Sequence, residues 1–372
     1  MTLLLLLLAA VCLLSYANGA NDNFKAVATV YGSSTLSYRA ALALATVAQV
    51  SGSIASVFLA GALVAAFGGK GLLPDAAVAD PRFLAAVGLG AAATILVATR
   101  MGLPVSTTHA MLGGLVGAGL ALAPEGLAWS KLGSRFALPL LVSPALAMAA
   151  AACLYPIART VRQRLGVEEV TCLCIAERIE PVAVTAGGSL VIARTGVELT
   201  ADLAGRCRKE YLGRVVGLSA QRVVDTLHQG SAFALGFARG LNDTPKIMAL
   251  LVAAAWSGVS VPVSLGVIAV MMALGGIIHS RRIAETMGRR ITGMNRGQGF
   301  VANAVGSTLV IGASLAGMPV STTHVSTGAI FGIGVWTGRT DWPVVGRIIA
   351  AWVVTLPMGL LLAYAIASSM SS

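Results

Sequence analysis

Pro104-Val105-Ser106-Thr107-Thr108-His109 is repeated without change as Pro319-Val320-Ser321-Thr322-Thr323-His324. A second motif is also present twice, because Gly19-Ala20-Asn21-Asp22 precedes the first copy and Gly240-Leu241-Asn242-Asp243 precedes the second. A lysine stands three residues after each aspartate, at Lys25 and Lys246. Two motifs that return in the same order indicate an internal repeat, so the chain consists of two homologous halves.

The composition is typical of a membrane protein. Hydrophobic residues make up 56% of the 372 residues and charged residues only 11%, whereas soluble domains carry about 25% charged residues. A spanning helix needs about 20 apolar residues. Ten apolar stretches lie at residues 2–30, 40–66, 83–99, 103–123, 136–158, 226–254, 262–278, 299–316, 318–337 and 344–369.

A polar insert divides these stretches into two sets of five. The predicted organisation is a first transmembrane repeat at 1–158, an insert at 159–225 and a second repeat at 226–372. Within the insert, the alternation from Val182 to Arg194 around Gly187–Gly188 predicts a β-hairpin. An odd number of crossings per half gives the two halves opposite orientations. We therefore expect an all-α polytopic membrane protein with two inverted-topology repeats and broken or re-entrant helices.

The net charge of +11 does not indicate nucleic-acid binding, because the basic residues gather between the apolar stretches. Most of them lie in the insert and in the 279–298 loop. Loops rich in arginine and lysine stay in the cytoplasm. We therefore expect a multi-pass protein of the cell membrane, embedded in lipid, with both termini outside and the insert cytoplasmic.

The Asn-Asp pairs lie inside apolar stretches. An ionised carboxylate at the centre of a membrane helix costs about 3 kcal/mol, so such a residue faces a cavity or a partner. Gly19 and Gly240 precede the two pairs and predict breaks in the helices. Because both copies carry the same residues, Asn21, Asp22, Asn242 and Asp243 are predicted to be functional.

The Pro-Val-Ser-Thr-Thr-His motifs have the residue order of a helix N-terminus, with proline first and hydroxyl side chains behind it. Free backbone N–H groups and the positive end of the helix dipole meet there, which is an arrangement that receives an oxyanion. A hydrolase is disfavoured, because no third residue is present nearby to orient a histidine base. His109 and His324 are therefore interpreted as structural donors near the cavity.

These motifs resemble those of the inorganic phosphate transporter (PiT) family, which moves phosphate together with a cation. Gly275-Gly276 and the stretch from Arg282 to Gly288 are also similar to that family, and the resemblance covers both halves. It implies that Asn21, Asp22, Asn242 and Asp243 lie at the substrate and cation sites. It further implies an anion site made of Ser106, Thr107, Thr108, Ser321, Thr322 and Thr323.

The chain departs from the family pattern near both aspartates. Lys25 stands where many members have asparagine, Lys246 matches it in the second copy, and Arg239 stands where a histidine is common. A lysine ammonium beside Asp22 occupies space that Na⁺ would otherwise fill, and buried lysines change their pKa readily. This favours H⁺ over Na⁺ as the coupling ion. The alternatives are Na⁺ at Asp22 and Asp243, or lysines that bind the anion or point to the interface.

Phosphate is the predicted substrate, because near neutral pH it carries a proton that Asp22 or Asp243 can accept. Sulfate lacks this proton and would be repelled by an unpaired carboxylate, but a bound cation or Lys25 would cancel that repulsion, so a sulfate permease is the alternative. A passive anion channel is less favoured, because the polar groups form two clusters rather than a continuous path. No enzymatic activity and no cofactor are expected. The resemblance implies a homodimer.

Overall fold

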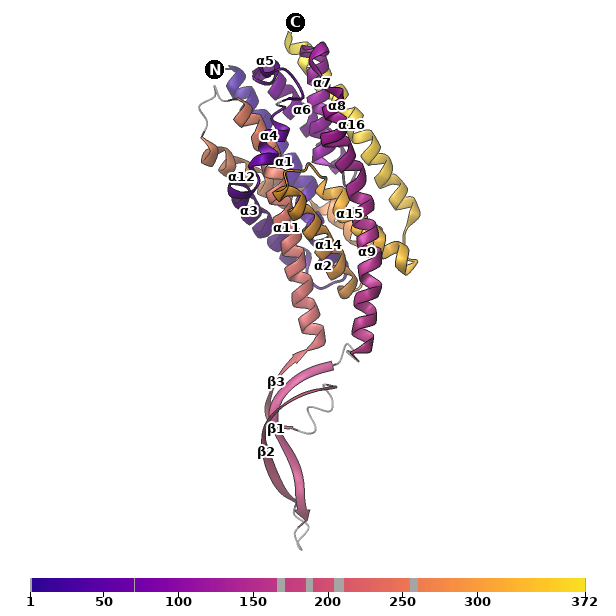
Figure 1. The fold of residues 1–372 in the computed structure, drawn as a ribbon. Coiled ribbons are helices and arrows are strands. Elements are labelled where there is room, and N and C mark those ends of the chain that lie inside the picture. Colours follow the sequence, from indigo (N-terminus) through magenta and orange to yellow (C-terminus); the bar gives the residue numbers. More distant parts are fainter. Residues whose placement is uncertain are drawn as a thin grey trace. The chain divides into compact units, whose positions relative to one another are not determined.

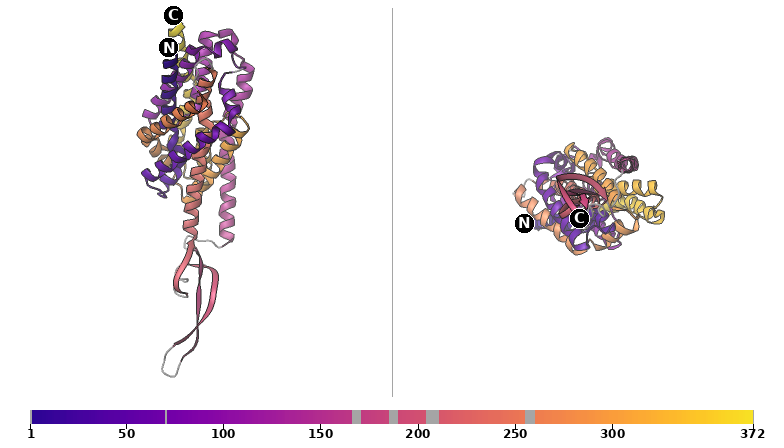
Figure 2. Two further views of the ribbon diagram at one scale, coloured as in Figure 1. Left: turned by 90° about the vertical axis from the view of Figure 1, so that its left-hand side faces the viewer. Right: turned by 90° about the horizontal axis from the view of Figure 1, so that it is seen from below.

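The computed structural model describes residues 2–69, 71–165, 171–184, 190–203, 211–254 and 260–371. The chain forms two compact units. Unit 1 combines Met1–Cys153 with Gln229–Ser372, and unit 2 is Leu154–His228. Both ends of the chain lie at the same end of unit 1 (Figures 1 and 2).

Each of the ten predicted apolar stretches contains a helix, so the helical membrane fold is confirmed. The first half holds α1 (Thr2–Asp22), η1 (Asn23–Val27), α2 (Ala28–Gly32), α3 (Tyr38–Leu59), α4 (Gly61–Phe67), α5 (Asp75–Val78), α6 (Pro81–Arg100), α7 (Thr107–Leu122), η2 (Pro124–Gly126), α8 (Trp129–Leu132), η3 (Gly133–Ala137) and α9 (Leu138–Arg164). The second half holds α11 (Ala220–Ala253), α12 (Val261–His279), α13 (Arg281–Glu285), η5 (Thr286–Arg290), α14 (Arg296–Leu315), α15 (Thr322–Thr337) and α16 (Trp342–Ser371).

Seven helical segments among the described residues are long and apolar enough to cross a membrane. Helices α7 and α15 are shorter, with 16 residues each. A helix of that length measures about 24 Å, whereas the hydrocarbon core is about 30 Å thick. Both helices therefore begin within the bundle, as expected of re-entrant elements.

The helix is broken at the first Asn-Asp pair but not at the second. Helix α1 ends at Asp22 and continues as the 3₁₀ turn η1. Helix α11, in contrast, runs without interruption from Ala220 to Ala253 and includes Pro245. The prediction of a break at Gly240 was therefore wrong, and this glycine serves helix packing instead.

Gly19 and Gly240 each touch the backbone of a helix from the other half. A Cβ on Gly19 would lie 1.8 Å from the carbonyl oxygen of Met272 in α12, and a Cβ on Gly240 would lie 2.1 Å from that of Gln49 in α3. Glycines on the facing helices make the reciprocal contacts. A Cβ on Gly275 would lie 2.0 Å from Tyr16 O, and a Cβ on Gly52 would lie 2.0 Å from Phe237 O. Helix α1 thus crosses α12, and α3 crosses α11, at backbone contact distance.

Glycines also bring α7 and α15 against helices of the other half. Glycines of α7 lie against the backbone of α16, and glycines of α15 lie against the backbone of α9. The contacts are Gly113 on Leu356, Gly117 on Leu360, Gly328 on Pro144 and Gly332 on Met148. Every one of these close crossings joins the first half of the chain to the second.

Unit 2 contains a three-stranded antiparallel sheet in the order β2-β1-β3. Its strands are β1 (Thr171–Val184), β2 (Leu190–Leu203) and β3 (Tyr211–Ser219). Strands β1 and β2 pair in antiparallel register as far as Val184 opposite Leu190, in agreement with the predicted hairpin. The expected turn at Gly187–Gly188 lies outside the described residues.

Candidate functional site

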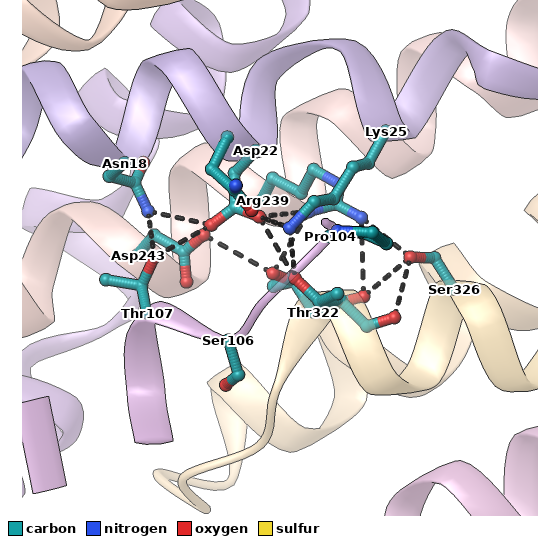
Figure 3. Close-up of polar contacts among 12 residues, drawn as sticks. Asn18, Asp22, Lys25, Pro104, Ser106, Thr107, Arg239, Asp243, Thr322 and Ser326 are labelled. Atoms are coloured by element: carbon teal, nitrogen blue, oxygen red, sulfur yellow. Dashed lines mark hydrogen bonds and ion pairs between the residues drawn. The ribbon is translucent and has the colours of Figure 1, made fainter. Parts of the chain in front are cut away.

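Asp22 lies at the centre of the polar cluster in unit 1 and is 2% exposed. Its Oδ1 accepts hydrogen bonds from Lys25, from Thr323 at 3.0 Å and from Arg239 at 3.4 Å. Its Oδ2 accepts from Asn18 at 3.0 Å and from Thr107 at 2.9 Å. Figure 3 shows these side chains converging on the starts of α7 and α15. The carboxylate is thus buried with both oxygens satisfied, as the cost of a charge in the membrane requires.

Lys25 uses all three donors of its ammonium group. It donates to Asp22, to the carbonyl oxygen of Val105 at 2.7 Å and to the hydroxyl of Thr323 at 2.7 Å. Val105 precedes α7 in the first half, whereas Thr323 lies in the first turn of α15 in the second half. One ammonium group therefore connects both re-entrant helix starts.

Lys246 repeats this arrangement with the halves exchanged. Its ammonium donates to Asp243 at 3.2 Å, to the carbonyl oxygen of Val320 at 2.9 Å and to the hydroxyl of Thr108 at 2.7 Å. Each lysine thus contacts the aspartate and the carbonyl of its own half and a threonine of the other half. The two copies of the motifs meet in one site.

Asn21 and Asn242 hold the segments that lead into α7 and α15. Asn21 donates to Thr99 at 2.8 Å and to Leu103 O at 3.1 Å, and its Oδ1 accepts from the backbone N–H of Val105 at 3.1 Å. Asn242 donates to Val320 O at 3.4 Å and accepts from Ser314 at 3.2 Å. Both amides therefore position the helix starts.

The helix starts predicted for the repeated motifs are confirmed. Ser106 and Ser321 are the N-cap residues of α7 and α15, and their hydroxyls accept from the backbone N–H groups of His109 and His324 at 3.1 and 3.2 Å. Thr107 and Thr322 stand in the first turns and donate to Asp22 and Asp243. The two serines act as caps, and the threonines connect the caps to the carboxylates.

Arg239 is a central member of the cluster. From the sequence it was identified only as a departure from the family pattern. Its guanidinium donates to Asp22 at 3.4 Å, to the hydroxyl of Thr322 at 3.2 Å and to Ser326 at 2.6 Å. The side chain is only 2% exposed. Arg239 precedes Gly240 as Asn18 precedes Gly19, and Asn18 donates to Thr107 at 2.9 Å as Arg239 does to Thr322. A comparison of the two copies would have revealed this substitution.

The cluster carries an excess of positive charge. Two aspartates face two lysines and one arginine, and all five side chains are buried, which leaves a formal excess of one positive charge. A buried charge without a counter-charge is costly. An anion that enters the cluster would compensate it, and the N-termini of α7 and α15 would add their partial positive charges.

His109 and His324 lie against each other at the starts of the two re-entrant helices. Their ring centroids are 4.4 Å apart, and the ring of Trp352 lies 3.9 Å from that of His324. The indole of Trp352 donates to the carbonyl oxygen of Pro104 at 3.1 Å. This stack joins both helix starts to α16, but His109 Nδ1 and His324 Nε2 have no hydrogen-bond partner among the described residues, so their predicted role as donors stays a prediction.

The chain is similar to known phosphate transport proteins over most of its length. Residues 18–363 match the phosphate transporter family. A protein of Pyrococcus horikoshii named "putative phosphate permease" is 28% identical over 93% of this chain and 92% of its own length. A "probable low-affinity inorganic phosphate transporter" of Rhizobium meliloti is 29% identical over 97% of this chain and 94% of its own length. A solved structure named "The sodium-dependent phosphate transporter" has a TM-score of 0.76 at 20% identity, over 100% of this chain and 99% of that one.

Proposed function

Because the chain belongs to the phosphate transporter family, we propose that it imports inorganic phosphate across the cell membrane by secondary active transport, with H⁺ rather than Na⁺ as the coupled cation. The observation that carries this proposal is the cluster in which Asp22 and Asp243 are each paired with a lysine of their own motif. The termini would lie outside and the insert in the cytoplasm.

The charge of the cluster supports an anionic substrate. Its excess positive charge lies in a buried site, where the attraction for an anion is much stronger than in water. The hydroxyls of the repeated motifs, at Ser106, Thr107, Thr108, Ser321, Thr322 and Thr323, are all buried there. In the proposed mechanism these hydroxyls exchange their internal hydrogen bonds for bonds to the phosphate oxygens, and Asn21 and Asn242 keep the two helix starts in place.

The reciprocal contacts between the halves support alternating access. Lys25 and Lys246 make the same three kinds of contact with the halves exchanged. Such an exchange is what two inverted repeats around one central site would produce. A rocking motion about that site would then give an outward-open and an inward-open state of similar construction.

The ligands of the lysines support H⁺ coupling. Each ammonium is surrounded by one carboxylate, one carbonyl and one hydroxyl oxygen, and oxygen atoms of these kinds are the ligands that hard metal cations use. Lys25 and Lys246 therefore take the places where Na⁺ would bind beside Asp22 and Asp243. A proton that enters with the phosphate can neutralise either carboxylate and so be transported with the anion.

Uptake of radiolabelled phosphate by proteoliposomes tests the proposal, with choline replacing Na⁺ and the pH gradient varied independently. We expect saturable uptake that persists in choline and increases when the outside is acidified. A strict requirement for Na⁺ would end the H⁺ part of the proposal. Flux that does not saturate would favour a channel, and uptake of sulfate without phosphate would favour the sulfate permease.

A further inference from the structure

A narrow void lies among α1, η1, α3, α11 and α12, next to the charged cluster. Asn18, Asn23, Gln49 and Arg239 line it together with the two aspartates. Gln49 is only 2% exposed, although it stands in the middle of the apolar helix α3. The void has no room for a water molecule as it stands.

Several of these lining side chains have buried atoms without a hydrogen-bond partner in the described part of the chain. They are both amide atoms of Gln49, the Oδ1 atoms of Asn18 and Asn23, and the Nε of Arg239. A buried polar atom left without a partner costs about 1–3 kcal/mol. Five such atoms on side chains that line one void indicate a site that is completed by a ligand.

The hydrogen-bond network fixes which amide atom of each asparagine is free. Thr46 donates its hydroxyl proton to the carbonyl oxygen of Leu42, so it can only accept from Asn23. Thr107 donates to Asp22, so it can only accept from Asn18. Both asparagines therefore donate from their NH₂ groups to threonine hydroxyls, and their Oδ1 atoms remain available as acceptors. The free donors come from Arg239 and Gln49.

We infer that Gln49, Asn18 and Asn23 make this void selective for oxyanions that carry a hydroxyl group. This inference rests on the proposed function and adds the residues that discriminate between substrates. When the α1–α12 pair moves away from the α3–α11 pair to admit the anion, Arg239 Nε and Gln49 Nε2 donate to its unprotonated oxygens. The side-chain carbonyl oxygens of Asn18, Asn23 and Gln49 are the acceptors available to its one or two P–OH groups. Sulfate has only acceptor oxygens at neutral pH, so it would face these acceptors unpaired.

The second half of the chain supplies a matched substitution for Gln49. Gln49 and Met272 hold equivalent places, because each sets its carbonyl oxygen against the glycine that precedes an Asn-Asp pair. Met272 also lines the void. Gln49→Met therefore keeps a side chain of similar volume and removes both the donor and the acceptor. Gln221→Met is the control, since Gln221 lies in unit 2 and bonds to Asp225 at 2.8 Å.

The experiment measures how phosphate, arsenate, sulfate and selenate compete with radiolabelled phosphate in proteoliposomes. Phosphate and arsenate carry a hydroxyl at neutral pH, whereas sulfate and selenate do not. In the wild type we expect arsenate to compete with radiolabelled phosphate, and sulfate and selenate not to compete. Gln49→Met removes a donor that both anions use and an acceptor that only arsenate uses. It should therefore reduce the preference for arsenate over sulfate by about tenfold, the worth of one hydrogen bond. Gln221→Met should leave it unchanged.

The possible failures are distinguishable. No phosphate uptake by the wild type would contradict the proposed function itself. Wild-type uptake with an unchanged arsenate-to-sulfate preference in Gln49→Met would contradict only the inference about the void. A Gln49→Met protein that elutes as an aggregate from size exclusion in detergent is replaced by Asn23→Leu, which removes a different acceptor and carries the same expectation.

Discussion

Lys25 and Thr323 stand 298 positions apart in the sequence and share a buried 2.7 Å hydrogen bond in unit 1. Lys246 and Thr108 share the same bond at the same length with the halves exchanged. Each lysine is thus held by a helix start that belongs to the opposite repeat. This relationship makes the stability of the cluster depend on both halves.

Removing the hydroxyl of Thr323 should destabilise the protein. Thr323→Val keeps the shape of the side chain but leaves one ammonium donor of Lys25 without an acceptor, at a cost of about 1–3 kcal/mol. Thermal unfolding in detergent measures the effect. Thr323→Ser retains the hydroxyl and is the matched control. Equal melting temperatures for the two variants would mean that this bond contributes nothing.

Neutralising Asp22 should be more severe. Asp22→Asn leaves Lys25 and Arg239 buried without their counter-charge, which costs about 3–5 kcal/mol. Removing Lys25 as well, in Asp22→Asn with Lys25→Met, should recover most of that loss because the charge balance returns. A double-mutant cycle of unfolding free energies tests this. Simple additivity of the two single variants would exclude the ion pair as the cause.

Replacing both lysines should create a response to Na⁺. In Lys25→Asn with Lys246→Asn, the oxygen ligands beside both aspartates lose their ammonium groups and become available to a cation. We expect the melting temperature of this variant to rise in NaCl relative to choline chloride, since a ligand of the folded state stabilises it. The wild type should melt alike in both salts. If the melting temperature of the variant is also the same in both salts, the lysines do not occupy Na⁺ sites.

The charge of Arg239 should determine the affinity for phosphate. Arg239→Met removes the excess positive charge of the cluster, so the KM for phosphate should rise by at least about tenfold, given the strength of charge interactions in buried sites. Arg239→Lys keeps the charge but lacks the guanidinium donors, so its KM should rise less than that of Arg239→Met. Uptake kinetics in proteoliposomes provide the comparison. A similar KM for the two variants would assign Arg239 a packing role.

The glycine crossings predict a clear difference between two Gly→Ala variants. Gly240→Ala would place a Cβ 2.1 Å from Gln49 O, so α3 and α11 would have to separate. Gly266→Ala in α12 meets nothing within 4 Å and should be neutral or stabilise the helix by up to about 1 kcal/mol. Yield and melting temperature in detergent distinguish them. Equal behaviour of the two variants would show that the crossing tolerates a wider spacing.

The sequence predicted the elements of the site that exist in two copies. The repeated Ser-Thr-Thr-His motifs have the composition of helix starts, and α7 and α15 begin at their threonines. The prediction of a helix break at Gly240 was wrong, because a glycine in a membrane helix can also allow another helix to pack closely. The sequence alone does not state which of these two uses applies. That choice depends on Gln49, a partner almost two hundred positions away.

A comparison of the two copies reveals the substitution at Arg239, but it assigns no role to Arg239 or Gln49, because neither has a chemical equivalent in the other half. Their counterparts are Asn18 and Met272. Only the spatial arrangement shows that these four side chains surround one void. A polar side chain in an apolar stretch is nevertheless a visible signal. Gln49 within the stretch at 40–66 carries that signal in the sequence.

The pairing of α1 with α12 and of α3 with α11 has a consequence for how the protein moves. Where a glycine lets one backbone rest on another, the two helices are locked together, because any sliding would drive side chains into a carbonyl group. Each locked pair takes one helix from each repeat. The two repeats therefore cannot move as separate rigid bodies during a transport cycle. Each rigid body must contain helices from both repeats. A half-chain made alone would also lack the surface on which its helices fold.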